Sequence, residues 1–379
     1  MNEQIKPVVV VGDGWAALGA VAELLTSGRK VQWIAGTGSR VFSPLPSLES
    51  STQGYGAVEA LVELSGKLGI ELGQEQSGNF LREFKNKAFR EAVWTKSDDL
   101  NERKQAREES LWDPERSLAN LFETSFELSL AEIEEQIRLK LTSEAFSGLR
   151  RIEGIHLTGV RIEDKKVHAV ILASGEEIEC DSLVYADRWG MLPKVAGLPK
   201  SLSFTRSRDA HGVLQVTFSH KAPIGLGVLE GFYGAMNREA GEEFERHVWG
   251  YFSSDGLKSY WTVCFSADEV EDNHEIAKKL RRMKTTLDKM FVGSDWVPNA
   301  EQGFMSTVAE EQVRFEESLI FASGEPPTEV IELPGAHGVS FLTDGYGPSC
   351  SFQQVGLLLN PGAASAQTQN AHSPHAAQL

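Results

Sequence analysis

Cysteine is scarce in this chain. Only three of its 379 residues are cysteines, and no two of them form a Cys-x-x-Cys pair. Disulfide frameworks and Cys-rich zinc sites depend on closely spaced cysteines, so we expect neither here. His-Glu-x-x-His and comparable metal-binding spacings are also missing, and we assign no residue to a metal.

Long apolar runs and blocks of positive charge are lacking as well. No stretch of about 18 apolar residues occurs, and the first residues do not have the layout of a signal peptide, so we expect a cytoplasmic protein. There are 54 acidic and 37 basic residues, which give a formal net charge of −17. Without a Lys/Arg block against that charge, we expect no nucleic-acid partner. The length suggests two or three domain-sized units.

The first 35 residues carry the clearest pattern. Four valines, Val8–Val11, are typical of a buried parallel strand, and residues 18–27 and 31–35 favour a helix and a second strand. The turn between the first strand and the helix reads Gly12-Asp13-Gly14-Trp15-Ala16-Ala17. This is the Gly-x-Gly-x-x-Gly/Ala fingerprint of a dinucleotide-binding βαβ unit, in its required context.

Each position of the fingerprint has a physical role. Gly12 permits a tight turn, Gly14 lets a diphosphate approach the backbone, and Ala17 lets the helix pack closely on the strand. The diphosphate then lies at the helix N-terminus, whose N–H groups and dipole favour anions. We therefore predict that Gly12, Gly14, Trp15, Ala16 and Ala17 bind the cofactor.

The acid that usually binds the adenosine ribose is missing. It is expected about 20 residues after the glycines, and an ungapped alignment places it at Ala35. Residues 36–40 contain no carboxylate. Thr37, Ser39 or backbone groups are possible substitutes. Arg40 is a candidate to meet a phosphate, and a solvated loop residue is an equal alternative.

Further along, the pattern changes twice. Residues 82–116 are dense in charges of both signs and predict a solvated helix or an excursion from the fold. A capping box at 129–132 then opens a helix. From 159 to 186 the apolar residues alternate with polar ones, which predicts a three-stranded meander that returns to a buried strand ending in Tyr185-Ala186-Asp187.

This helix, meander and returning strand resemble the FAD-binding domain of the glutathione-reductase type. The phytoene desaturase, amine oxidase and aromatic hydroxylase families share that plan, and in them the opening fingerprint carries the FAD diphosphate. An apolar strand at 337–342 followed by Thr343-Asp344-Gly345 resembles their closing motif. The resemblance implies that Asp344 binds the ribityl chain of FAD and that Gly345 lies beside it. The alternative is that Asp344 is an ordinary turn residue.

The segment between these motifs is rich in aromatic residues. Residues 247–252 and 260–265 flank a Ser-Ser-Asp-Gly turn and predict a hairpin. A following helix has an apolar face and a basic face, which we expect to be solvated. The basic face comprises Lys278, Lys279, Arg281, Arg282 and Lys284. In the resembled families an insert of this kind covers the flavin and holds the substrate.

The predicted fold class is α/β, a Rossmann-like FAD-binding domain with a three-stranded β-meander plus an inserted α+β substrate domain. The predicted divisions are 1–75, 129–199 and 329–360 for the discontinuous FAD-binding domain, 76–128 for a charged helical excursion, 200–328 for the substrate domain, and 361–379 for a disordered tail.

No Gly-x-Ser-x-Gly elbow or other catalytic constellation occurs, so the chemistry must come from a cofactor, and we name no catalytic residue. We expect an FAD-dependent oxidoreductase that oxidises a C–H or C–N bond of a small, apolar or aromatic substrate by hydride transfer to flavin. The alternatives are a non-catalytic accessory protein, as in the Rab GDP-dissociation inhibitors, and an NAD(P)-dependent reductase. A protein partner at 76–128 or at the basic face of 274–291 also stays open.

Overall fold

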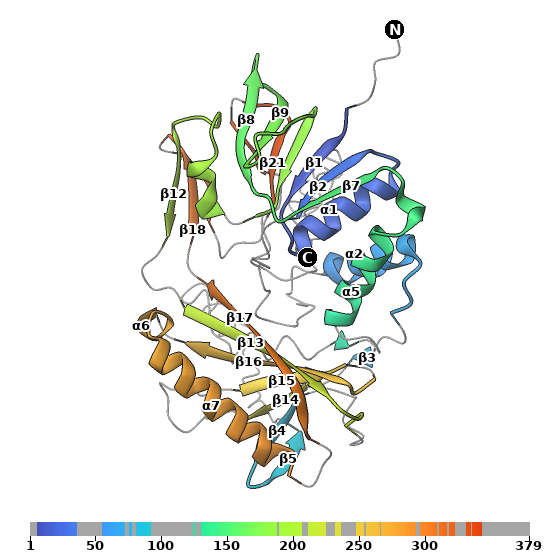
Figure 1. Cartoon of the computed structure of the whole chain (residues 1–379), viewed down its shortest axis with the longest axis vertical. Helices are drawn as coiled ribbons and strands as arrows, with labels where there is room; N and C mark the ends of the chain where they lie inside the picture. The colour runs from blue at the N-terminus through green and yellow to red at the C-terminus, as the bar shows by residue number, and fades with distance from the viewer. Residues whose placement is uncertain are drawn as a thin grey trace, which may run out of the picture.

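The chain folds into two lobes (Figure 1). The computed structural model describes residues 6–35, 55–72, 76–77, 81–91, 124–125, 130–187, 189–206, 211–224, 232–235, 248–253, 255–265, 267–292, 296–308, 311–316, 318–322, 331–334 and 336–342. The upper lobe contains a largely parallel sheet with helices, and the lower lobe contains a largely antiparallel sheet with one long helix. Within these residues, no helix is both long and apolar enough to cross a membrane.

The upper lobe is built on a six-stranded sheet in the order β20-β21-β11-β1-β2-β7. Its strands are β1 (Val8–Val11), β2 (Val31–Ala35), β7 (Leu149–Glu153), β11 (Ser182–Tyr185), β20 (Ile331–Glu332) and β21 (Val339–Phe341). All neighbours pair in parallel except β20 with β21. This arrangement confirms the predicted βαβ unit and the return of a late strand to the sheet.

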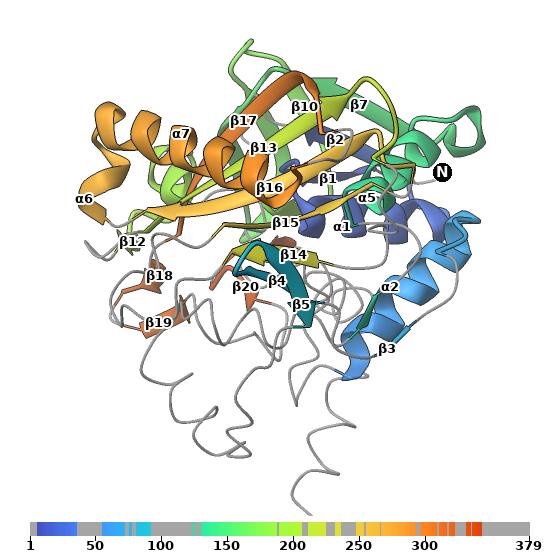
Figure 2. The same ribbon diagram turned by 90° about the horizontal axis from the view of Figure 1, so that it is seen from below.

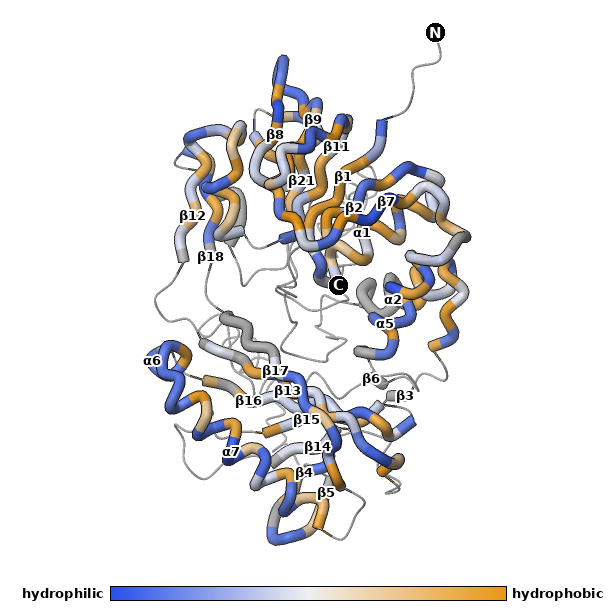
Figure 3. The backbone as a smooth tube through the Cα atoms, viewed as in Figure 1, coloured by the Kyte–Doolittle hydropathy of each residue, from blue (hydrophilic) through white to orange (hydrophobic). Residues whose placement is uncertain are grey.

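The two faces of this sheet have separate cores. On one face lie the helices α1 (Trp15–Thr26), α2 (Tyr55–Leu68) and α5 (Leu130–Leu141), and on the other lies the meander of β8 (Leu157–Glu163), β9 (Lys166–Leu172) and β10 (Glu177–Glu179). Val8 and Val10 pack toward the helices, whereas Val9 and Val11 pack toward the meander. The four valines are therefore all buried, as a strand covered on both faces requires. Figure 3 shows the apolar residues concentrated along β1, α1 and β11.

The lower lobe is a seven-stranded sheet in the order β17-β13-β16-β15-β14-β4-β5. Its strands are β4 (Leu81–Lys85), β5 (Ala88–Glu91), β13 (His211–His220), β14 (Phe232–Ala235), β15 (Val248–Phe252), β16 (Lys258–Phe265) and β17 (Pro298–Val308). The predicted hairpin is β15–β16, and the predicted amphipathic helix is α7 (Asn273–Met290), preceded by the short α6 (Ala267–Val270). Met283, Leu287 and Met290 of α7 are buried against one face of the sheet.

The prediction of a helical excursion is wrong for residues 81–91. These residues form the β4–β5 hairpin, and β4 pairs in parallel with β14 at the edge of the lower sheet (Figure 2). The ring centroids of Phe84 and Phe89 are 5.3 Å apart, and both rings pack on the core of the lower lobe. Charged residues around and between them dominate the composition of residues 81–91. Residues 92–123 lie outside the described residues, as does the predicted tail 361–379. The short strand β6 (Thr124–Ser125) follows the first of these segments.

Residues 200–328 do not share a single core. The strands β12 (Leu202–Arg206), β18 (Glu311–Phe315) and β19 (Ser318–Ala322) form a separate sheet, and Leu202 and Val313 belong to the meander-side core of the upper lobe. A second correction concerns Lys279, which we placed on a solvated face. It is buried beneath α6, where its ammonium binds Glu269 and lies 4.9 Å from the centre of the Phe265 ring.

Candidate functional site

The glycine turn after β1 lies where the sheet topology reverses. From β1 the chain crosses through α1 to β2 on one side, while β11 pairs with β1 on the other. The Gly12 amide donates to the Ile34 carbonyl at 3.0 Å, and the Ala186 amide donates to the Val11 carbonyl at 2.8 Å. Ligands of open α/β sheets bind at such a switch point, outside the carboxyl ends of the strands.

Gly12 cannot be replaced without moving the backbone. Its φ is +131°, and a Cβ atom there would lie 2.2 Å from the carbonyl oxygen of Ala186. Only glycine fits both this conformation and this close approach. The role predicted for Gly12 in the turn is therefore a packing requirement between β1 and β11.

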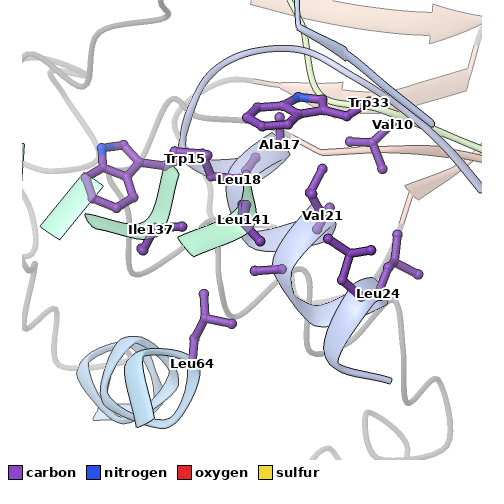
Figure 4. Close-up of a cluster of buried hydrophobic side chains, with 14 of the residues drawn as sticks. Val10, Trp15, Ala17, Leu18, Val21, Leu24, Trp33, Leu64, Ile137 and Leu141 are labelled. Carbon is purple, nitrogen blue, oxygen red and sulfur yellow. The ribbon is translucent and has the colours of Figure 1, made fainter. Parts of the chain in front are cut away.

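Helix α1 presents its N-terminus at this turn. Gly14 is the N-cap, with extended backbone (φ −91°, ψ −171°), no capping side chain and no acidic residue in the first helical turn. The positive end of the helix dipole therefore has no carboxylate of its own helix to compensate it. The side chains of Trp15, Ala16 and Ala17 are buried in the helix-side core, and Trp15 points toward Ile137 of α5 (Figure 4). These three residues can reach a ligand only through their backbone.

Asp13 places a carboxylate inside the glycine turn, and Arg138 of α5 binds it. The Arg138 Nη1 lies 2.5 Å from Asp13 Oδ1, and its Nη2 donates to the Asp13 carbonyl at 2.5 Å. Glu134, one turn earlier on α5, lies 2.9 Å from the same guanidinium. Burial works to lower the pKa of Arg138, but Glu134 and Asp13 outweigh it and raise the pKa above its usual value. The turn therefore carries a neutralised carboxylate.

Trp33 of β2 lies beneath the turn. Its Nε1 donates to the Gly12 carbonyl at 2.8 Å, and its ring is fully buried. The Arg151 guanidinium of β7 lies 4.6 Å from the centre of that ring, and the Arg138 guanidinium lies 5.9 Å from it. Ala35, where the ribose acid was expected, ends β2 and is 2% exposed. Arg40 lies outside the described residues.

The closing strand also reaches this edge of the sheet. The Leu342 amide, just after β21, donates to the Tyr185 carbonyl of β11 at 2.9 Å, and the Trp189 Nε1 donates to the Leu342 carbonyl at 3.2 Å. The carboxyl ends of β1, β11 and β21 therefore lie side by side. Asp344 and Gly345, which follow, lie outside the described residues, so their predicted contacts remain expectations.

The lower lobe turns a polar row toward the upper lobe. Gln215, Thr262 and Trp249 are cross-strand neighbours on β13, β16 and β15, and they are 4%, 2% and 0% exposed. Side chains alternate along a strand, and residues next to these three pack on α7, so the row lies on the other face. Among the described residues, Gln215 Oε1 and Trp249 Nε1 have no hydrogen-bond partner.

Two tyrosines of that face show its orientation. Tyr251 and Tyr260 are stacked with centroids 5.0 Å apart, and burial together with Glu132 and Glu135 of α5 raises the pKa of Tyr260. Lys258, at the start of the same strand, lies 3.5 Å from Glu135. The face that carries the polar row is thus directed at the upper lobe. Composition predicted the aromatic residues here, but it did not distinguish this face from the one under α7.

No protein-family model matches the chain, and a comparison with curated proteins gives no match. Solved structures match over nearly the full length. L-proline dehydrogenase from P. horikoshii is 13% identical with a TM-score of 0.55, and the match covers 97% of this chain and 94% of that one. Glycine oxidase from Bacillus cereus is 13% identical with a TM-score of 0.55, covering 96% and 95%.

A third match is aklavinone-11 hydroxylase, solved in complex with FAD and aklavinone. It is 14% identical with a TM-score of 0.53, and the match covers 97% of this chain and 64% of that one. Identities this low establish a shared fold rather than a shared reaction. Among the described residues, no group of three or more His, Cys, Asp or Glu side chains is placed to hold a metal ion. The chain therefore shares its fold with these three proteins.

Proposed function

We propose that this protein binds FAD and is an FAD-dependent oxidoreductase. The observation that carries the proposal is the Gly12 turn, held between β1, β2 and β11 at the switch point of the sheet, with the N-terminus of α1 beside it. That combination is suited to a diphosphate. The match over 97% of the chain to a hydroxylase solved with FAD supports FAD over other dinucleotides.

The residues present fit such a cofactor. A carboxylate in the glycine turn would repel a diphosphate, but Asp13 is bound by Arg138, and both side chains are nearly buried. The side chains of Trp15, Ala16 and Ala17 are buried in the helix-side core, so none of them fills the space in front of the helix N-terminus. We assign the diphosphate to the backbone at Gly14. Gly12 shapes the turn, because its amide donates to the Ile34 carbonyl and its carbonyl accepts from Trp33. On the resemblance, we assign the ribityl chain to Asp344 with Gly345 beside it.

When bound, FAD would supply a hydride acceptor for a C–H bond of the substrate, and where that carbon carries nitrogen, loss of the hydride oxidises the C–N bond. The protein's part is to hold a small substrate and exclude water. In our proposal the face of Gln215, Thr262 and Trp249, which is 0–4% exposed in this structure, becomes one wall of that site when substrate displaces what covers it. A substrate with an apolar or aromatic body would pack on the stacked tyrosines, accept a hydrogen bond from Trp249 Nε1 and donate one to Gln215 Oε1. Each bond would satisfy a buried polar atom that otherwise costs stability.

The test is anaerobic mixing of FAD-loaded protein with a panel of amines, amino acids and aromatic compounds, read out as bleaching of the flavin absorbance. Trp249→Phe should raise the half-saturating concentration of the active compound about tenfold, the scale of one lost hydrogen bond. Trp261→Phe is the matched control, because Trp261 is equally buried, has an equally unpartnered Nε1 among the described residues, and lies on the opposite face. Equal effects of the two variants would contradict the assigned wall.

The absence of an acid at Ala35 favours one alternative, a non-catalytic protein that keeps the fold without the cofactor. A test of whether the protein can be loaded with FAD distinguishes the two functions. Protein that folds, remains colourless and cannot be loaded with FAD would support the accessory role and overturn the oxidoreductase.

A further inference from the structure

We propose that Glu153, on the neighbouring strand β7, binds the adenosine ribose in place of the acid that β2 lacks. The inference rests on the proposed FAD binding and names a residue for it. It starts from the pairing of β2 with β7, in which Ala35 and Glu153 are direct partners at the carboxyl ends of both strands. The missing carboxylate is thus present one strand away, about 4.8 Å in the pairing direction.

The two positions share a face of the sheet. Trp33 and Arg151, two residues earlier on each strand, are also direct partners, and the Arg151 guanidinium lies over the Trp33 ring. Because side chains alternate along a strand, Ala35 and Glu153 point to this same side. It is the side of α1 and the glycine turn, since Trp33 donates to the Gly12 carbonyl.

Arg151 holds the carboxylate in place. Its Nη2 lies 2.9 Å from Glu153 Oε1, while its Nε is buried and has no hydrogen-bond partner among the described residues. Contacts therefore run from the glycine turn through Trp33 and Arg151 to Glu153. The Glu153 side chain is 65% exposed, so a ribose can approach its second oxygen from outside the lobe.

The first experiment compares FAD with its analogue carrying 2′-deoxyadenosine, by fluorescence titration of the apoprotein. Wild type should bind FAD about tenfold more tightly than the analogue, the scale of a hydrogen bond to a charged group. Glu153→Gln should weaken FAD about tenfold and leave the analogue unchanged. Glu176→Gln is the control, because Glu176 is also exposed and forms a 2.9 Å ion pair with an arginine of β7, Arg150. Glu176 lies in the turn between β9 and β10 of the meander, on the other face of the sheet, so this variant should behave as wild type.

The second experiment moves the acid back. Ala35→Glu in the Glu153→Gln background should restore FAD affinity, whereas Ala35→Glu alone should not tighten it, because two carboxylates on adjacent strands repel each other. FAD binding that ignores Glu153→Gln overturns this inference alone. Wild-type protein that binds no FAD overturns the proposed function and this inference with it.

Discussion

Gly12 and Gly14 differ in the reason that each must be glycine. Gly12 is required by the fold, because its φ is positive and a Cβ atom would collide with the Ala186 carbonyl. Gly12→Ala should lower the free energy of unfolding by about 1–3 kcal/mol from backbone strain alone, with more from the contact with Ala186. Urea denaturation of the FAD-free protein measures this. A variant as stable as wild type would show that the turn does not have this conformation.

Arg138 has two tasks, because it both braces the turn and neutralises Asp13. Removing one partner of a nearly buried ion pair typically costs about 3 kcal/mol, so Arg138→Met should destabilise the protein on that scale. It should also weaken FAD, since the Asp13 carboxylate would then face the diphosphate. Adding Asp13→Asn should recover most of the FAD affinity but only part of the stability, because Glu134 still lacks its arginine. A double variant that binds FAD no better than Arg138→Met would contradict the neutralising role.

The fingerprint residues were recognisable from the sequence because their chemistry is local. Arg138 and Glu153 were not, since each acts through a contact with a distant segment: α5 against the glycine turn, and β7 beside β2. The i,i+4 spacing of Glu134 and Arg138 was the only local signal for the first, and nothing local signalled the second.

At the scale of elements, the apolar runs of the parallel sheet and the alternation of the meander predicted their strands correctly. The hairpin at 81–91 was missed because its inward residues, such as Phe84 and Phe89, are separated by charged ones that dominate the composition. Lys279 was misplaced for a related reason: it lies at the border of the apolar face of α7, where α6 covers it.

The strand β13 carries a pH-sensitive position at its end. The ring of His220 is buried next to Trp296, its Nε2 lies 2.9 Å from Ser259 Oγ, and burial lowers its pKa. The folded protein therefore favours neutral His220, while the unfolded chain protonates it below about pH 6.5. The stabilisation is complete above that pH and is lost as the pH falls through the folded-state pKa, at no more than about 1.4 kcal/mol per pH unit.

His220→Gln should remove this part of the acid sensitivity, because glutamine does not titrate. The urea midpoints of both proteins should be measured from pH 8 to pH 5. On acidification the wild type should lose more stability than the variant, so the midpoint of the wild type minus that of the variant should fall toward pH 5. Parallel curves over the whole range would exclude a contribution from His220.

At the scale of the whole molecule, two sheets of different kinds are turned toward each other. The parallel sheet brings the carboxyl ends of β1, β11 and β21 to one edge, and the lower sheet directs its polar row and its tyrosines toward that lobe. Composition and motifs could predict two lobes. Their division could not be read from the sequence, because β4–β5 joins the lower sheet from far upstream and β12 with β18 returns to the upper core.

FAD binding at the Gly12–Gly14 turn is the basis of the proposed function. The most direct measurement is the amount of FAD bound per folded chain for wild type and Gly14→Val, with circular dichroism to establish folding. Gly14 has a backbone conformation that any residue can adopt, so valine adds no backbone strain, and its side chain should block the diphosphate. We predict stoichiometric FAD on the wild type and almost none on the variant. Full FAD on a folded Gly14→Val protein, or none on the wild type after loading, would contradict FAD binding at this turn.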